Sequence, residues 1–297
     1  MRVGTCMNTI AVGTDSCKYP LANFEMREPD LAAFADETGL GAAQIHVRQL
    51  GSKEAAAWSL DDGRTVYPAS MIKVPLALAV GQAISAGRLR WDTQVTVDPR
   101  NETLNDAPSP IVPGYRTTVK ELVTYMLQRS DNVATNQLYD VLGREHATAD
   151  VHALGFRRTF FRRKLSGALP RIDDPEMTGI NAFPAAEAAA VFAALAEDRV
   201  PQAAVLRGIL ATSWWDVKLS RGLKRGDRFA HKTGDTDEVA HDGGMLTLSD
   251  SSRWVVVVYT ELPSSEENDA RFGAFMRMLR PRLRRTRPGT TPSGVEA

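Results

Sequence analysis

Cysteine is scarce in this sequence. The 297 residues contain two cysteines, Cys6 and Cys17, both close to the N-terminus. A disulfide between them could not cross-link a core formed further along the chain, and no cysteine or histidine spacing matches a metal site. The sequence therefore predicts a fold that is held together by its hydrophobic core, without a metal.

Net charge and long apolar runs are lacking as well. Lysine plus arginine number 36, as do aspartate plus glutamate, so no overall field attracts nucleic acid. No apolar run approaches the roughly 20 residues of a membrane-spanning helix. Polar residues also interrupt the N-terminus, where a secretory signal needs roughly 7–15 uninterrupted apolar positions. We expect a cytoplasmic protein with no membrane or nucleic-acid partner, unless the true start codon lies elsewhere.

Arginines gather near the C-terminus, where a positive cluster could bind nucleic acid. They are Arg277, Arg280, Arg282, Arg284, Arg285 and Arg287. A solvated helix end that runs into a disordered tail over 281–297 is the favoured interpretation. A second tail is predicted over 1–25.

Strand patterns occur at both ends of the chain. Alternating residues predict strands over 43–47 and 55–60, with Gly51 in the turn between them. Further strands are predicted over 229–233, 245–248 and 254–260. The last of these is rich in β-branched residues and is expected to be buried on both faces.

Helical spacing fills the middle of the chain and its end. The predicted helices cover 71–85, 119–128, 133–142, 185–196, 205–210 and 266–279. Strands at both ends with helices between them indicate an α/β fold, in which one sheet joins the two ends. We predict an α/β lobe from 26–66 and 213–280 and a helical lobe over 67–212, with a substrate cleft between them.

Three short motifs stand in order along the chain. They are Ser70-Met71-Ile72-Lys73 at the start of a long helix, Ser130-Asp131-Asn132 between two helices, and Lys232-Thr233-Gly234 on a late strand. Each has an ordinary structural explanation by itself, as a helix cap, a surface charge or a capping turn. All three in this order, each in its expected context, form a specific signal.

The chemistry of these residue types supports grouping them. Lys73 shares a helix face with Ser70 and can take its proton if burial and a second cation, Lys232, lower the pKa of the lysine. A helix start also places backbone N–H groups beside Ser70, which suits developing negative charge. Ser130 can then relay a proton to a leaving nitrogen.

Other residues of the motifs are suited to substrate binding. Asn132 offers an amide that can hold a substrate amide, Thr233 lies beside it in the predicted site, and Gly234 lets the strand backbone approach a ligand closely. Trp214 and Trp215 precede the third motif and could line the cleft, although packing in the core is the favoured interpretation.

With these motifs, the sequence resembles the class A β-lactamase and penicillin-recognising serine hydrolase family over residues 31–275. Similar passages include 122–143, 155–159 and His241-Asp242. The resemblance implies a β-lactamase/transpeptidase-like fold, with an antiparallel sheet and an inserted helical lobe. It further implies an acyl-enzyme on Ser70, an oxyanion hole from the backbone amides of Ser70 and Asp235, and a small β-lactam, amide or ester substrate without metal or organic cofactor.

The sequence departs from the family pattern at two places. The family carries a glutamate that activates the deacylating water, whereas the count from Asn132 leads here to Ser166, and 163–170 contains no carboxylate. Asp173, Asp174 and Glu176 follow later, and Glu176 is the candidate that could activate water. Asp235 stands where the family has a small residue, and its carboxylate would repel the carboxylate of a penicillin.

These departures leave alternatives open. The first is a cytoplasmic biosynthetic acyltransferase or esterase that passes the acyl group to an amine or alcohol. The second is a non-hydrolytic penicillin-binding sensor that holds its acyl group. The acyl donor, the acceptor and the oligomeric state stay undetermined at this stage.

Overall fold

The computed structural model describes residues 29–51, 55–61, 63–168 and 170–283. Both cysteines, the predicted tail over 1–25 and the arginines beyond 283 lie outside these ranges. Within them, no helix has the length and apolar character that a membrane span requires.

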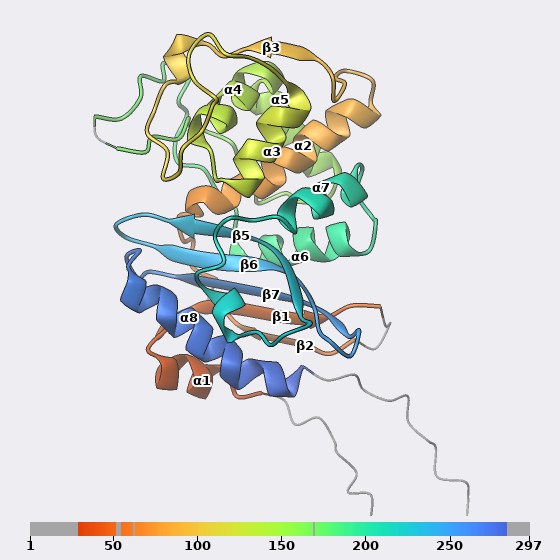
Figure 1. Cartoon of the computed structure of the whole chain (residues 1–297), viewed down its shortest axis with the longest axis vertical. Helices are drawn as coiled ribbons and strands as arrows, with labels where there is room; N and C mark the ends of the chain where they lie inside the picture. Colours follow the sequence, from red (N-terminus) through yellow and green to blue (C-terminus); the bar gives the residue numbers. More distant parts are fainter. Residues whose placement is uncertain (1–28, 52–54, 62, 169, 284–297) are drawn as a thin grey trace, which may run out of the picture.

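A five-stranded antiparallel sheet joins the two ends of the chain (Figure 1), with strand order β2-β1-β7-β6-β5. The strands are β1 (Gln44–Gln49), β2 (Ala57–Leu60), β5 (Arg228–Asp235), β6 (Ala240–Thr247) and β7 (Arg253–Thr260). This confirms the predicted α/β class and the antiparallel sheet. β6 begins earlier than the predicted residue 245, because His241 and Asp242 are buried polar residues whose hydrogen bonds are satisfied inside the sheet layer.

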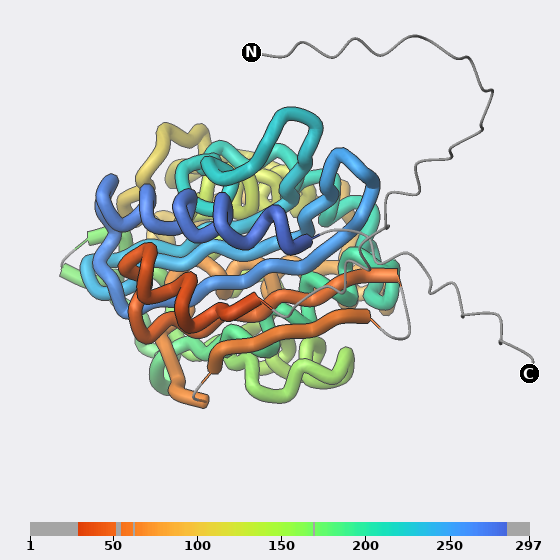
Figure 2. Tube along the Cα trace, turned by 90° about the horizontal axis from the view of Figure 1, so that it is seen from below, coloured from red at the N-terminus to blue at the C-terminus, as the bar shows by residue number. Residues whose placement is uncertain are grey.

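Two helices cover one face of the sheet. α1 (Leu31–Thr38) and α8 (Glu266–Leu279) lie side by side there, as the two views show (Figures 1 and 2). Asp30 caps α1 by accepting a hydrogen bond from the Ala33 N–H at 2.9 Å, a local signal that the hydrophobic pattern alone does not reveal. Leu283, inside the segment predicted as a tail, is buried against this layer.

The other face of the sheet is covered by α6 (Ala185–Ala196), which packs on β1, β6 and β7. Apart from Glu187 in its first turn, its alanine-rich sequence is apolar, as expected of a helix enclosed between a sheet and further helices. The remaining elements are α2 (Lys73–Ser85), α3 (Val119–Gln128), α4 (Asn132–Leu142), α5 (Arg144–Ala153), α7 (Ala203–Leu210), and a small hairpin of β3 (Gln94–Thr96) and β4 (Arg116–Thr118). Thr118 caps α3, accepting from Glu121 N–H at 3.2 Å.

Candidate active site

Ser70 lies where the sheet meets the helical part of the molecule. It belongs to a short 3₁₀ turn, η1 (Ala69–Ile72), and α2 begins only at Lys73, so the prediction that Ser70 opens the long helix is corrected. Ala69 has φ 44°, a left-handed conformation that a non-glycine residue adopts only when its surroundings enforce it. The turn therefore presents Ser70 in a geometry that an ordinary helix start would not give.

Gly234 brings the edge strand β5 against this turn. A Cβ atom added at Gly234 would lie 3.0 Å from the Pro68 carbonyl oxygen and 3.2 Å from the Met71 nitrogen. The glycine thus allows the close contact between β5 and η1, and the approach of the strand to a ligand stays a prediction. This contact joins the two segments whose backbone amides, those of Ser70 and Asp235, are expected to form an oxyanion hole.

Gly234→Ala should therefore impair acylation without unfolding the protein. The added methyl group would push β5 away from η1, and we expect the second-order rate constant of acylation to fall by about tenfold or more, because misplacing a reacting geometry by ~1 Å is costly. Stopped-flow acylation of the variant measures this, with Gly208→Ala as the control, because nothing lies within 4 Å of an added Cβ there. Equal rates for both variants would contradict this role.

Lys73 is buried at the centre of the candidate site. Its Nζ lies 2.8 Å from Ser70 Oγ, 2.7 Å from the Ser130 carbonyl oxygen and 2.7 Å from Asn132 Oδ1. Burial lowers the pKa of Lys73 well below its ordinary value, and the charge of Lys232 lowers it further. A neutral lysine has two N–H donors, which can donate to the Ser130 carbonyl oxygen and to Asn132 Oδ1. Its one lone pair is left to accept a hydrogen bond from the Ser70 hydroxyl.

Ser130 lies between the two buried lysines. Its Oγ is 3.1 Å from Lys73 Nζ and 2.9 Å from Lys232 Nζ, and its backbone has φ 61°, again in the left-handed region. Lys232 also donates to the Thr233 carbonyl oxygen at 2.8 Å. Burial lowers the pKa of Lys232 to about 7, with the charge of Lys218 adding to this effect. The structure thus brings Ser70, Lys73, Ser130 and Lys232 together.

Asn132 begins α4, and Asp131 caps that helix by accepting from the Ala134 N–H at 2.8 Å. The side chain of Asn132 is engaged at both ends. Its Oδ1 faces Lys73, and its Nδ2 donates to the Leu104 carbonyl oxygen at 3.0 Å. Asn132 therefore links Lys73 to the loop that carries Leu104, and the second N–H of its amide is the one that could bind a substrate amide.

The segment expected to carry a deacylating carboxylate lies against α4. Asn136 holds Leu165 by its backbone, since Asn136 Oδ1 accepts from Leu165 N–H at 2.8 Å and Nδ2 donates to its carbonyl at 2.9 Å. The Ser166 hydroxyl accepts from Ile172 N–H at 2.9 Å, within its own loop. Neither position supplies a carboxylate.

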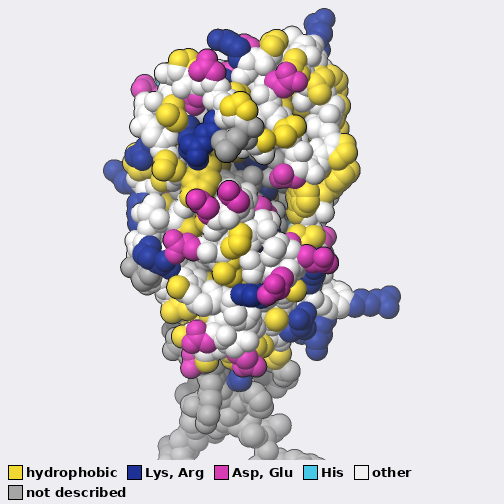
Figure 3. Space-filling view, turned by 90° about the vertical axis from the view of Figure 1, so that its left-hand side faces the viewer, with side chains coloured by type: hydrophobic (Ala, Val, Ile, Leu, Met, Phe, Trp, Pro, Cys, Tyr) yellow, Lys and Arg dark blue, Asp and Glu magenta, His cyan; other side chains and the backbone are white. Residues whose placement is uncertain are grey.

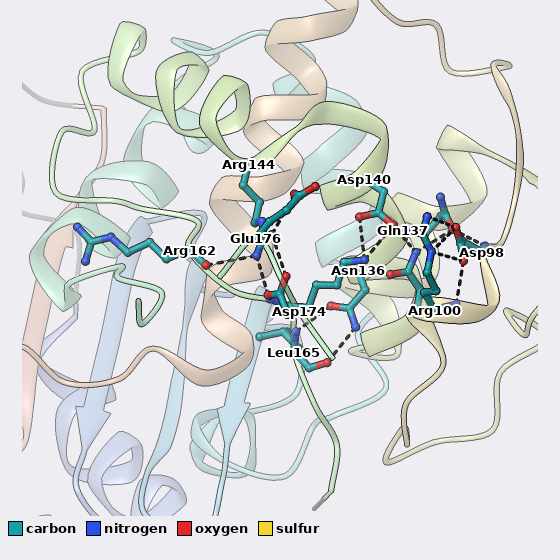
Figure 4. A network of polar contacts seen from close by, with 12 residues as sticks. Asp98, Arg100, Asn136, Gln137, Asp140, Arg144, Arg162, Leu165, Asp174 and Glu176 are labelled. Carbon is teal, nitrogen blue, oxygen red and sulfur yellow. Dashed lines mark hydrogen bonds and ion pairs between the residues drawn. The ribbon is translucent and has the colours of Figure 1, made fainter. Parts of the chain in front are cut away.

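Glu176, the sequence-based candidate for activating water, points elsewhere (Figure 4). Its side chain is 82% exposed and its carboxylate pairs with Arg144 at 3.1 Å. Arg144 also forms a two-pronged ion pair with Asp174, at 2.6 and 2.8 Å. This geometry does not support the hypothesis for Glu176, because its carboxylate is exposed and paired with Arg144.

Arg144 should matter for stability rather than chemistry. Both Arg144 and Asp174 have side chains 7% exposed. Arg144→Met should lower the free energy of unfolding by about 2–3 kcal/mol, below the ~3–5 kcal/mol of fully buried pairs because Glu176 shares the arginine from the solvent side. Arg88→Met, which removes a more exposed pair with Asp150, should cost less than about 1 kcal/mol. Urea unfolding measures both, and equal losses would contradict the anchoring role.

Two tryptophans lie beside the second motif. Trp215 donates from Nε1 to the Arg129 carbonyl oxygen at 3.1 Å. Trp214 is 52% exposed, and the Arg129 guanidinium stacks on its ring at 3.7 Å. The interpretation of Trp214 as a core residue is therefore wrong, because a charged neighbour and not the core covers its ring.

Comparison with known proteins matches this geometry to a family. The model of the beta-lactamase enzyme family matches residues 27–278. This chain belongs to the beta-lactamase enzyme family. It is 26% identical to the extended-spectrum beta-lactamase PER-1 of Pseudomonas aeruginosa over 218 residues, which is 68% of this chain and 70% of that protein.

Solved structures share the fold of the family with this chain. A beta-lactamase from Sphaerobacter thermophilus has a TM-score of 0.70 at 23% identity, covering 85% of this chain and 96% of that one. PBP-A, as a leucine-to-glutamate mutant in an acyl-enzyme complex with penicillin G, has a TM-score of 0.71 at 20% identity, covering 84% of this chain and 94% of that one. At these identities the likeness concerns the fold.

Some residues around this beta-lactamase-family site were not found from the sequence. Buried His231 lies 2.7 Å from Asp242 Oδ1 and 3.1 Å from Asp216 Oδ1, and Asp242 accepts from the Leu219 N–H at 2.9 Å. Burial alone would lower the pKa of His231, but the two carboxylates outweigh it and raise the pKa to about 9. This network ties the segment that carries Lys218 to the sheet beside Lys232.

Proposed function

We propose that this chain is a serine hydrolase that forms an acyl-enzyme on Ser70 with a β-lactam or a related amide or ester, and that it releases the acyl group slowly. The observation that carries the proposal is the buried Lys73, whose Nζ lies 2.8 Å from Ser70 Oγ and whose pKa is lowered by burial. A serine hydroxyl becomes an effective nucleophile when a base at this distance accepts its proton.

Acylation then proceeds through the grouped side chains. Neutral Lys73 accepts the proton of Ser70 as Oγ bonds to the substrate carbonyl carbon, and the backbone amides of Ser70 and Asp235 hold the oxyanion. The proton passes from Lys73 to Ser130, whose own proton goes to the leaving group as the amide or ester bond breaks. Lys232, 2.9 Å from Ser130 Oγ, stabilises negative charge that develops on that oxygen.

Slow release follows from the residues at the deacylation position. One general base contributes roughly 100- to 10,000-fold to a rate, and Leu165 and Ser166 provide no such group. PBP-A is a fold relative for which a leucine-to-glutamate mutant is known as a penicillin G acyl-enzyme. We propose that Leu165, held by Asn136, occupies the corresponding position in this chain.

The lack of a general base at Leu165 and Ser166 also favours a second candidate function, transfer of the acyl group to an amine or alcohol. A site without a base for water still releases its acyl group to a nucleophile that binds in the cleft. Turnover that rises with added glycine methyl ester, beyond the rate in buffer, would favour the transferase. Turnover that is independent of the amine would favour the slow hydrolase.

Burst kinetics test the proposed function. A chromogenic β-lactam or thioester should release about one equivalent of leaving group per protein quickly and further equivalents slowly. Ser70→Ala should abolish both phases. No burst with any lactam or thioester, or a burst that survives in Ser70→Ala, would overturn the proposal.

A further inference from the structure

A buried lysine and a half-buried aspartate form an ion pair at the end of β5. Lys218 Nζ lies 2.6 and 2.8 Å from the two carboxylate oxygens of Asp235, and 3.2 Å from Asp269 Oδ1 on α8. The Lys218 side chain is 1% exposed, whereas that of Asp235 is 29% exposed. A molecule that approaches this end of the strand therefore meets the carboxylate before it meets the ammonium group.

The charge of this cluster does not cancel. One ammonium group serves two carboxylates, so no positive charge of Lys218 is left over. The two other lysines at this end are engaged as well. Lys232 donates to Ser130 and Thr233, and Lys73 contacts Ser70, Ser130 and Asn132. Each of the three lysines already has hydrogen-bond or ion-pair partners inside the protein.

Further carboxylates surround the same end of the strand. Asp237 and Glu238 are exposed in the turn that joins β5 to β6. Asp106 is exposed on a loop of the helical part. Its negative charge lies near enough to act on Lys73 and Lys232, where it works to raise the pKa of each lysine. The space-filling view of this side shows acidic side chains beside the hollow in the middle of the molecule (Figure 3). The part of the mouth beside the end of β5 is therefore acidic.

From this arrangement we propose that Asp235 is a specificity residue, which favours substrates with a cationic leaving-group end and disfavours those with a carboxylate there. The leaving-group end is assigned because Lys232 contacts Ser130, the group proposed to protonate the leaving group, and the carboxylate of Asp235 lies near enough to Lys232 for its charge to act on that lysine. The inference rests on the proposed function. A carboxylate brought beside Asp235 loses affinity by like-charge repulsion, whereas an ammonium group gains a charge-assisted hydrogen bond.

The ion pair makes the inference reversible by substitution. Asp235→Ala removes the outer carboxylate and uncovers Lys218, which then presents a cation to the same substrate group. Asp235→Asn keeps the shape of the side chain and removes its charge, so it guards against a loss of folding in the alanine variant. Asp237→Ala is the matched control, because it removes an exposed aspartate from the adjoining turn.

The experiment compares three thioesters with one acyl group and different leaving thiols. Phenylacetyl thioesters of thiocholine, 2-methoxyethanethiol and 3-mercaptopropionate carry a positive, a neutral and a negative leaving-group end. Thiol release, followed with a disulfide dye, gives kcat/KM for each. For each variant, the kcat/KM of the cationic ester is divided by that of the anionic ester, so that differences in overall activity between variants cancel.

We expect this ratio to fall by at least about tenfold in Asp235→Ala and Asp235→Asn, since each factor of ten needs only ~1.4 kcal/mol. It should stay within about twofold in Asp237→Ala, whose charge lies further out and is screened by solvent. Adding Lys218→Met to Asp235→Ala should remove any gain with the anionic ester. Acylation of Ser70 with an unchanged ratio would overturn this inference alone. Acylation by none of the thioesters and by no β-lactam would overturn the proposed function as well.

Discussion

Leu165→Glu should convert a lasting acyl-enzyme into one that turns over. The variant places a carboxylate at a position whose backbone Asn136 already holds from both sides, at 2.8 and 2.9 Å. A general base there should raise the deacylation rate constant by about 100- to 10,000-fold. The rate is measured by isolating the acylated protein and following the return of its unmodified mass.

Leu165→Gln provides the control for this prediction. Glutamine has the size and polarity of glutamate but accepts no proton near neutral pH, so any effect of opening the buried loop appears in both variants. The deacylation rate constant of Leu165→Glu should exceed that of Leu165→Gln by about 100- to 10,000-fold. If both variants deacylate at the same rate, water access and not a missing base limits the wild-type protein.

Lys73→Met should lower the rate constant of acylation by about 100- to 10,000-fold, because the hydroxyl of Ser70 then lacks its proton acceptor. In the wild-type protein only neutral Lys73 is the base. Its pKa is lowered, so acylation should rise with pH and level off well below pH 10.5, the ordinary pKa of lysine. The pH profile of kcat/KM for a neutral thioester, whose own charge does not change with pH, measures this.

Lys73→Arg separates the base from its positive charge. Arginine keeps a cation in the site but does not lose its proton in proteins. It should be as slow as the methionine variant, without the rise with pH. An arginine variant with most of the wild-type activity would show that the charge of Lys73, and not its lone pair, promotes acylation.

The sequence contained most of what is needed to group the candidate site. Short motifs identify residue types. The three motifs lie far apart in the sequence and meet because β5 packs against η1 and Ser130 lies between Lys73 and Lys232. Spacing did not reveal the conformation around Ser70. The left-handed backbone of Ala69 and Ser130 is imposed by packing against β5 and α2, and such tertiary effects leave no local pattern.

The polar residues behind β5 were missed for a similar reason. Lys218 stands in a segment with no motif, and no local pattern pairs it with Asp235, which the fold brings to within 2.6 Å. The polar residues His241 and Asp242 likewise lie in β6 ahead of the predicted strand over 245–248. Polar residues are expected at the surface, and these are buried because each finds a hydrogen-bond partner inside.

The chain belongs to the beta-lactamase enzyme family, and the loop after α5 departs from the glutamate pattern of class A enzymes. The ion pair of Arg144 with Asp174 holds this loop, yet the loop presents a leucine and a serine where a base is expected. We therefore expect the two steps to differ in rate, with fast acylation supported by Lys73 and slow deacylation without a carboxylate.

Intact-protein mass spectrometry over time tests both steps in one measurement. The wild-type protein mixed with the phenylacetyl thioester of thiocholine should gain one acyl group within minutes and keep it for hours after the reagent is removed, while Ser70→Ala should gain none. An adduct that maps to another residue, or one that Ser70→Ala still forms, would contradict the assignment of the nucleophile. Rapid loss of the adduct from the wild-type protein would contradict the claim that its deacylation lacks a base.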